Sequence, residues 1–210
     1  MRKLTALQAL ILISVAYVAT QMLSDIASLK IVLIGGLSMD AGTLIYPLTF
    51  TLRDLVHKSG GLKVARLLIV VAAGVNVIMA LLFQLIAVLP SDPAVGDQVA
   101  FSQVLAPVWR IVIASIMAEV VSEWIDGDIY HAVQKRWGNK RQWARVLLSN
   151  AVSVPLDSAI FTFIAFLGDL PISVVLGIFI SNMLMKFVLT FVFLPSIYFV
   201  KGRNDDGIHS

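Results

Sequence analysis

The amino-acid sequence predicts an all-α integral membrane protein, a single domain over residues 1–210 built as a bundle of six transmembrane helices. Three observations support this prediction. First, hydrophobic residues make up 59% of the chain and charged residues only 14%, against about 25% charged residues in soluble domains, and the mean hydropathy is +0.90. Second, apolar segments recur at lengths that cross a bilayer, which takes about 20 helical residues. Third, lysines and arginines gather in alternate connections between these segments.

The segments expected to cross the membrane follow one another with short connections. We expect spans at residues 4–23, 41–57, 64–89, 104–125, 145–167 and 172–200. The first span follows Met1-Arg2-Lys3 without a small-residue cleavage pattern, so no cleavable signal is expected. Between the first two spans, Ile26 to Ser38 is apolar but too short to cross, and we expect a loop or a re-entrant segment there. The second span is short and is interrupted by Pro47, a pattern found at binding sites of transporters.

The distribution of positive charge predicts the orientation of the bundle. Lysines and arginines precede the first span, follow the sixth, and fill the connections after the second and fourth spans. In the opposite connections Lys30 is the one basic residue, and the other charged residues are acidic. By the positive-inside rule, we expect both termini in the cytoplasm and a multi-pass protein of the inner (cytoplasmic) membrane.

The fifth expected span, residues 145–167, contains an acid at bilayer depth. Four residues share one helix face because they follow the spacing i, i+3, i+7, i+11: Asn150, Ser153, Asp157 and Phe161. A carboxylate near the bilayer centre costs roughly 2.5–3.5 kcal/mol on the lenient insertion scales, so such residues usually have a function. A structural hydrogen bond between helices is the alternative interpretation of Asp157.

Two further charged residues are expected at the depth of Asp157. At a rise of about 1.5 Å per residue, Lys186 in the sixth span lies roughly 20 Å from the outer turn at Pro171, and Glu119 in the fourth span has a comparable depth. Two acids and one amine neutralise each other in part, and a remaining acid can bind a proton or a cationic ligand. A salt bridge of Lys186 that sets the helix register is the alternative.

Aromatic and amide side chains complete a candidate binding site. Aromatic rings offer flat apolar faces, and side-chain amides offer paired donors and acceptors. Most phenylalanines are expected to face lipid or to pack, and the tryptophans near the membrane edges fit an aromatic belt. The candidate substrate-binding residues are Asp157, Lys186, Asn182, Asn150, Glu119, Ser153, Phe161, Tyr46 and Asn76.

Four blocks of sequence, spread from the end of the first span to the sixth, carry a resemblance that extends over nearly the whole chain: SDIASLK (24–30), AGTLIYPLTFTLRDL with GGLKVAR (41–66), EWIDGDIYHAVQK with RQWARVLLSNAVSVPLDSAIFTFIAFLG (123–168), and NMLMKFVLTFVFLPSIY (182–198). Together they resemble the queuosine precursor transporters, also called the vitamin uptake transporter family. The third block is the most specific, with Trp143-x-Arg145-x-x-x-Ser149 followed by Asp157-Ser158-x-x-Phe161. The chain departs from the family pattern at Asp25, where asparagine is common.

The resemblance implies an importer of 7-deazaguanine bases, 7-cyano-7-deazaguanine or its 7-aminomethyl relative, for tRNA queuosine salvage. The candidate residues suit this ligand, because one carboxylate can accept both N1–H and the exocyclic amine of a guanine-like edge. We expect Asp157 to accept that edge, Lys186 to balance charge or contact the carbonyl, and Glu119 to be a gate or proton site. The other residues expected at a gate or proton-coupling site are Asp54, Glu123, Asp128 and Arg145.

Several functional classes are disfavoured. Without cysteine the chain cannot form a disulfide or a thiolate metal site, and we expect no metal or cofactor. His57 and His131 fall in cytoplasmic connections, so no Ser–His pair lies at bilayer depth and an intramembrane enzyme is disfavoured. Topology explains the basic connections, so the expected partners are the small base and the lipid bilayer, and no nucleic acid.

The main alternative is a substrate-binding subunit of an energy-coupling factor vitamin transporter. Such a subunit needs a transmembrane partner and ATPase subunits, and this chain has no Gly-rich Lys-Ser/Thr loop of its own. The sequence leaves open the energy source, the preferred 7-substituent and whether copies form a homo-oligomer.

Overall fold

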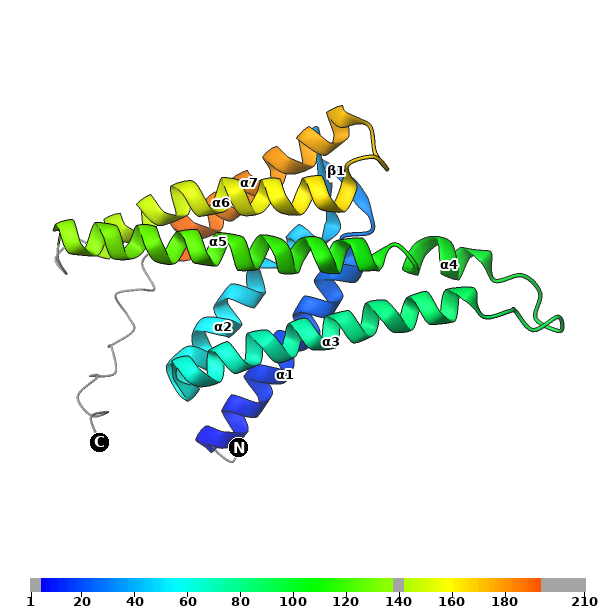
Figure 1. Cartoon of the computed structure of the whole chain (residues 1–210), viewed down its shortest axis with the longest axis horizontal. Helices are drawn as coiled ribbons and strands as arrows, with labels where there is room; N and C mark the ends of the chain where they lie inside the picture. The colour runs from blue at the N-terminus through cyan, green and yellow to red at the C-terminus, as the bar shows by residue number, and fades with distance from the viewer. Residues whose placement is uncertain (1–4, 138–141, 194–210) are drawn as a thin grey trace.

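The structure, a computed structural model, describes residues 5–137 and 142–193. Within these residues the chain is mainly α-helical, with one short 3-10 helix and one two-stranded sheet (Figure 1). In chain order the elements are α1 (Ala6–Ala27), β1 (Ile31–Ile34), β2 (Leu37–Asp40), the 3-10 helix η1 (Ala41–Leu44), α2 (Pro47–Gly60), α3 (Leu62–Val88), α4 (Val99–Leu105), α5 (Val108–Trp137), α6 (Gln142–Phe166) and α7 (Ile172–Phe193).

The long apolar helices are those of a multi-pass membrane protein. Among the described residues, four stretches are long and apolar enough to cross a bilayer: Leu7–Ala27, Lys63–Val88, Val99–Ser122 and Ile172–Leu189. Large apolar side chains cover their outer surfaces; on α3, for example, Leu67, Val70 and Ile78 are 64%, 69% and 66% exposed. The apolar part of α6, Asn150–Phe166, is shorter, and the 14 residues of α2 span about 21 Å. The expected total of six crossings therefore stays a prediction.

The all-α prediction is wrong between α1 and α2, where the expected loop is a β-hairpin. β1 pairs antiparallel with β2, and Ile34 and Leu37 form the last pair before the turn. Gly35 and Gly36 have φ values of 60° and 83°, which is what a two-residue turn with positive φ at both positions requires. The β-branched residues of β1 favour extended backbone, and the segment is too short for a spanning helix.

The β-hairpin packs against α7 (Figure 1). The Ser181 hydroxyl donates to the Ser38 carbonyl over 2.6 Å. Gly177 lies against the same strand, because a Cβ added there would be 3.2 Å from the Ser38 Cβ. These contacts bring the end of β2, and with it Asp40, close to α7.

Prolines account for two further differences from the expected spans. Pro107, which lacks an N–H donor, separates α4 from α5, so the expected span 104–125 is divided and α5 then continues to Trp137. The expected second span, 41–57, begins as η1 and becomes α-helical only at Pro47, the first residue of α2, where proline is well tolerated. Pro155, by contrast, lies inside α6 without ending it. Residues 194–200 of the expected sixth span lie outside the described residues.

Apolar side chains from distant segments hold the helices together. One buried cluster joins α1, α2 and α3 and includes Tyr17 and Ala72. A second joins α5, α6 and α7 through Ile111 and Ile178, and a third includes Met79 between α3, α5 and α1. Many of the other buried residues are polar and come from α1, η1, α5, α6 and α7, so the packed helices also enclose a polar region.

Candidate functional site

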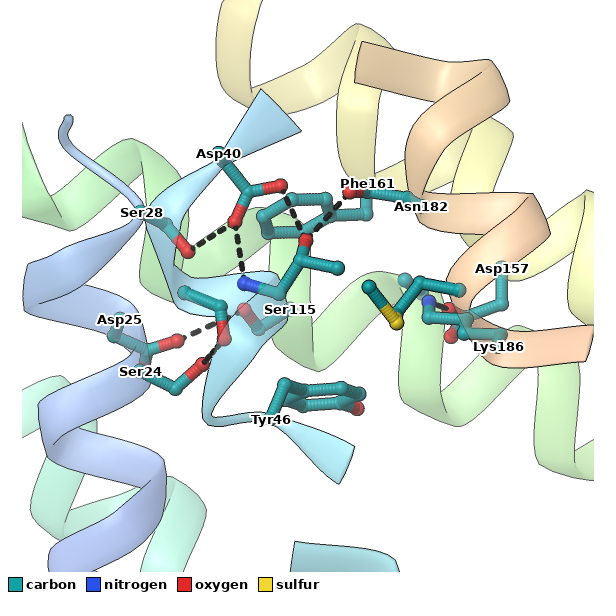
Figure 2. A pocket seen from close by; sticks show the side chains of 14 residues that line it. Ser24, Asp25, Ser28, Asp40, Tyr46, Ser115, Asp157, Phe161, Asn182 and Lys186 are labelled. Carbon is teal, nitrogen blue, oxygen red and sulfur yellow. Dashed lines mark hydrogen bonds and ion pairs between the residues drawn. The ribbon is translucent and has the colours of Figure 1, made fainter. Parts of the chain in front are cut away.

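A small cavity lies among α1, the end of β2, η1, α5, α6 and α7. Figure 2 shows Asp25 at one end, Asp157 with Lys186 at the other, and the rings of Tyr46 and Phe161 between them. The lining residues are Ser24, Asp25, Ser28, Asp40, Gly42, Thr43, Tyr46, Ser115, Ala118, Asp157, Phe161, Asn182, Met185 and Lys186.

An ion pair between α6 and α7 forms one end of the cavity. Lys186 Nζ contacts Asp157 Oδ2, and the two side chains are only 12% and 14% exposed. The other carboxylate oxygen of Asp157 accepts a bond from the Ser122 hydroxyl over 3.1 Å. The ammonium also lies 5.4 Å from the centre of the Tyr46 ring, within the range of a cation–π contact. Two residues that the sequence placed at one depth therefore form a charged pair beside an aromatic face.

Asp40 organises the wall formed by β2 and η1. As the N-cap of η1, it accepts the Thr43 backbone N–H over 3.1 Å, the role for which aspartate is favoured. Its carboxylate also accepts the Ser28 hydroxyl of α1 over 2.8 Å and the Thr43 hydroxyl over 2.9 Å. The Thr43 hydroxyl lies 2.5 Å from the Asn182 Oδ1 of α7, and donates its single proton to one of these two oxygens at a time. Asp40 thus ties α1 and η1 together, and Thr43 extends the network to α7.

Asp25, in the last turn of α1, forms the other end of the cavity. Its Oδ1 accepts the Ser115 hydroxyl of α5 over 3.0 Å. Its Oδ2 is buried and has no hydrogen-bond partner. The neighbouring Ser24 hydroxyl donates to the Gly42 carbonyl over 3.0 Å, so this part of α1 contacts both α5 and η1.

Gly42 allows η1 to approach α1 closely. A Cβ at this position would lie 2.0 Å from the Ser28 Oγ and 2.4 Å from the Ser24 carbonyl oxygen, which are impossible distances for nonbonded atoms. Any larger residue would push η1 away from α1 and move Thr43 and Tyr46 with it. The local geometry of the cavity wall therefore depends on glycine at this position.

Five of the nine predicted substrate-binding residues line the cavity: Tyr46, Asp157, Phe161, Asn182 and Lys186. Glu119, Asn150, Ser153 and Asn76 do not. Asn150 shares a helix face with Asp157 but lies seven residues earlier in α6, about 10 Å away along the helix axis. Asn76 is buried on α3, a helix that contributes no lining residue. The side chains of the predicted gating residues Asp54, Glu123, Asp128 and Arg145 lie outside the described residues.

Sequence reasoning missed the polar residues that α1, β2, η1 and α5 contribute to the lining: Ser24, Asp25, Ser28, Asp40, Thr43 and Ser115. A local signal existed for Asp40, because aspartate is a favoured N-cap residue. The spacing of Ser24 and Ser28 by four residues also puts them on one face of α1. Their shared wall depends on the β-hairpin, which was not predicted.

Comparisons with known proteins agree with the resemblance noted in the sequence. The family model described as "Putative vitamin uptake transporter" matches residues 40–200. A protein from Bacillus subtilis (strain 168) named "Probable queuosine precursor transporter" is 32% identical over 188 residues, which cover 87% of this chain and 81% of the relative. No solved structure matches the chain. The family match includes every segment that lines the cavity except α1.

Proposed function

Because the chain belongs to the vitamin uptake transporter family, the family of the queuosine precursor transporters, we propose that it imports 7-deazaguanine precursors of queuosine. The family and the relative are transporters, so the protein is a transporter and not an enzyme. The proposed substrates are 7-cyano-7-deazaguanine and its 7-aminomethyl relative. One observation supports this substrate class above the others: a partly buried carboxylate, an amide and two aromatic rings line the same cavity.

The proposed roles follow from the chemistry of the lining. The Asp157 carboxylate receives bonds from Ser122 and Lys186, and each of its oxygens has a second lone pair with which to accept N1–H and the exocyclic amine of the base. Lys186 lies against this carboxylate and supplies a compensating positive charge. Asn182 offers an amide for the polar edge of the base.

A flat heterocycle also needs surfaces on which to stack. Tyr46 and Phe161 come from η1–α2 and α6, and Figure 2 shows them on different sides of the space between the acidic ends. Edge-to-face and offset-stacked ring contacts contribute about 0.5–1.5 kcal/mol each beyond the area they bury. Stacking would hold the base, and the polar residues would select its edge.

The interruption between η1 and α2 fits a transport site. Broken helices at transporter sites expose backbone and side-chain polar groups to the substrate. Here the break at Tyr46 and Pro47 adjoins the cavity wall. We propose that η1 and α2 move relative to α6 and α7 during transport, with Glu119, Asp54, Glu123, Asp128 and Arg145 at the gate or at a proton-coupling site.

The decisive experiment measures binding of 7-cyano-7-deazaguanine to the purified protein, with guanine and biotin as competitors. We expect saturable binding that biotin does not displace. We also expect Asp157→Asn to reduce the affinity by at least tenfold. Asp169→Asn is the matched control, because its side chain is 60% exposed and lies outside the cavity. If biotin competes and the deazaguanine does not bind, the proposed substrate class is wrong. Uptake into proteoliposomes that contain this chain alone would exclude the alternative of a subunit that requires an ATPase partner.

A further inference from the structure

The Asp25 carboxylate is buried without a charged partner at the end of the cavity opposite Lys186 (Figure 2). Asp25 is 5% exposed. Its Oδ1 accepts the neutral Ser115 hydroxyl, and its Oδ2 is buried without a hydrogen-bond partner. Buried polar groups in proteins are almost always hydrogen-bonded, so an oxygen left open beside a cavity indicates a group that arrives from outside the chain.

The charges along the cavity wall are unequally neutralised. Its described lining contains three carboxylates and one ammonium. The ammonium of Lys186 pairs with Asp157, and both oxygens of Asp40 receive neutral donors from Ser28 and Thr43. Asp25 has no basic residue within ion-pair distance in the described part of the chain. An isolated anion in a low-dielectric interior is unfavourable, so a carboxylate here is stabilised either by a proton or by a cationic group beside it.

A structural role does not account for Asp25. It lies in the last turn of α1, where the partial negative charge of the helix end disfavours an acid. It caps no helix, and its one bond, to Ser115, could be made equally well by a neutral asparagine. Asp40, which does have a structural role, has both oxygens occupied. The difference between the two acids is that Asp25 has an open oxygen and no basic partner among the described residues.

We propose that Asp25 is a second recognition point, which binds a protonated primary amine on the substituent of a planar base while the polar edge of the same base lies at Asp157. This inference rests on the proposed function and extends it to a preference for a cationic substrate. An ammonium donates to Oδ2 and supplies the missing positive charge in one contact. A nitrile, which has no proton to donate, makes neither interaction. The transporter therefore favours the 7-aminomethyl base over the 7-cyano base.

Equilibrium binding of the two bases to wild type and to Asp25→Asn tests the proposal. Asparagine keeps the shape and the acceptor for Ser115 but removes the charge. We expect the affinity for the 7-aminomethyl base to fall about 10- to 100-fold, the effect of a hydrogen bond to a charged group, and the affinity for the 7-cyano base to change by less than about threefold. Asp97→Asn, in an exposed loop, is the control and should change neither. Asp157→Asn should weaken the binding of both bases.

A second measurement does not depend on the variant's folding. Wild type should bind the 7-aminomethyl base about 10- to 100-fold more tightly than the neutral 7-hydroxymethyl isostere. Equal affinities would overturn the proposal. An equal loss of affinity for both bases in Asp25→Asn would also overturn it, because Asp25 would then contact the edge that the bases share or would serve folding. If wild type binds the bases but Asp25→Asn changes only the dependence of uptake on a proton gradient, the cation at Asp25 is a proton and the proposal is wrong. If wild type binds none of the bases, the proposed function itself fails, and this inference fails with it.

Discussion

Breaking the Asp157–Lys186 pair should destabilise the protein more than removing both charges. The two side chains are only 14% and 12% exposed, so Lys186→Met leaves a largely buried carboxylate without its cation and Asp157→Asn leaves a largely buried ammonium without its anion. Removal of one partner of a buried pair costs about 3–5 kcal/mol, whereas replacement of the whole pair is often close to neutral. We therefore expect each single variant to be less stable than the double variant.

The magnitude can be measured by thermal unfolding in detergent. Because the pair keeps some solvent contact, we expect the lower end of the range, about 3 kcal/mol for each single variant, which corresponds to a decrease in Tm of roughly 6–12 °C for a chain of this size. The double variant should recover most of this decrease. Asp97→Asn, an exposed acid in the loop before α4, should change the free energy of unfolding by less than about 0.5 kcal/mol.

The double-mutant cycle also contains the result that would refute this reasoning. If the double variant loses the sum of the two single losses, the charges do not stabilise each other and the cycle has no coupling term. The two residues would then contribute through packing alone. Uptake measured in the same variants separates stability from transport, since a stable double variant that does not transport supports the proposed role of the carboxylate.

Three further outcomes can be checked independently. Gly42→Ala should lower the free energy of unfolding by about 1–3 kcal/mol or more, because its Cβ would overlap α1. The control Gly74→Ala, whose Cβ meets open space in a helix, should be neutral or stabilising by up to about 1 kcal/mol, and equal Tm shifts in the two variants would contradict this. Arg110→Met should destabilise the protein more than Asp169→Asn, because the guanidinium donates to two backbone carbonyls at the end of α6, whereas the ion pair with Asp169, which is 60% exposed, is weak. The reverse order of Tm values would argue against a stabilising role of the bonds from Arg110 to the end of α6. Since the chain has no cysteine, Ser91→Cys can be labelled specifically, and a membrane-impermeant maleimide should modify it from outside in spheroplasts; protection there and labelling only in inverted vesicles would reverse the proposed orientation.

The pairing of Asp157 with Lys186 shows which part of the site could be predicted. Each is a charged residue within an apolar segment, which is conspicuous in sequence because lipid disfavours charge. Their depths follow from the helical rise and the position of the connecting turn, and the structure brings them into contact. A short connection between α6 and α7 made this estimate robust, since it leaves little freedom in the relative positions of the two helices.

The opposite wall of the cavity could not be predicted in the same way. Asp25 and Ser115 are 90 residues apart in sequence, and Thr43 and Asn182 are 139 residues apart. No periodicity reports which helices become neighbours over such separations. The sequence marked Asp25 as a departure from the family pattern but did not place it in the site, because its burial depends on contacts from α5 and η1.

The sequence by itself determined three things: that this chain lies in a membrane, which residues form most of its helices, and that charged residues lie within those helices. It could do so because the cost of exposing polar groups to lipid acts on each segment separately. Its motifs also determined the family. The tertiary structure alone decided that a β-hairpin separates α1 from α2, that Gly42 brings η1 against α1, and that Asp25 lies opposite Lys186 across one cavity. These features depend on close packing between segments far apart in the chain, and packing of that kind leaves no regular pattern in the sequence.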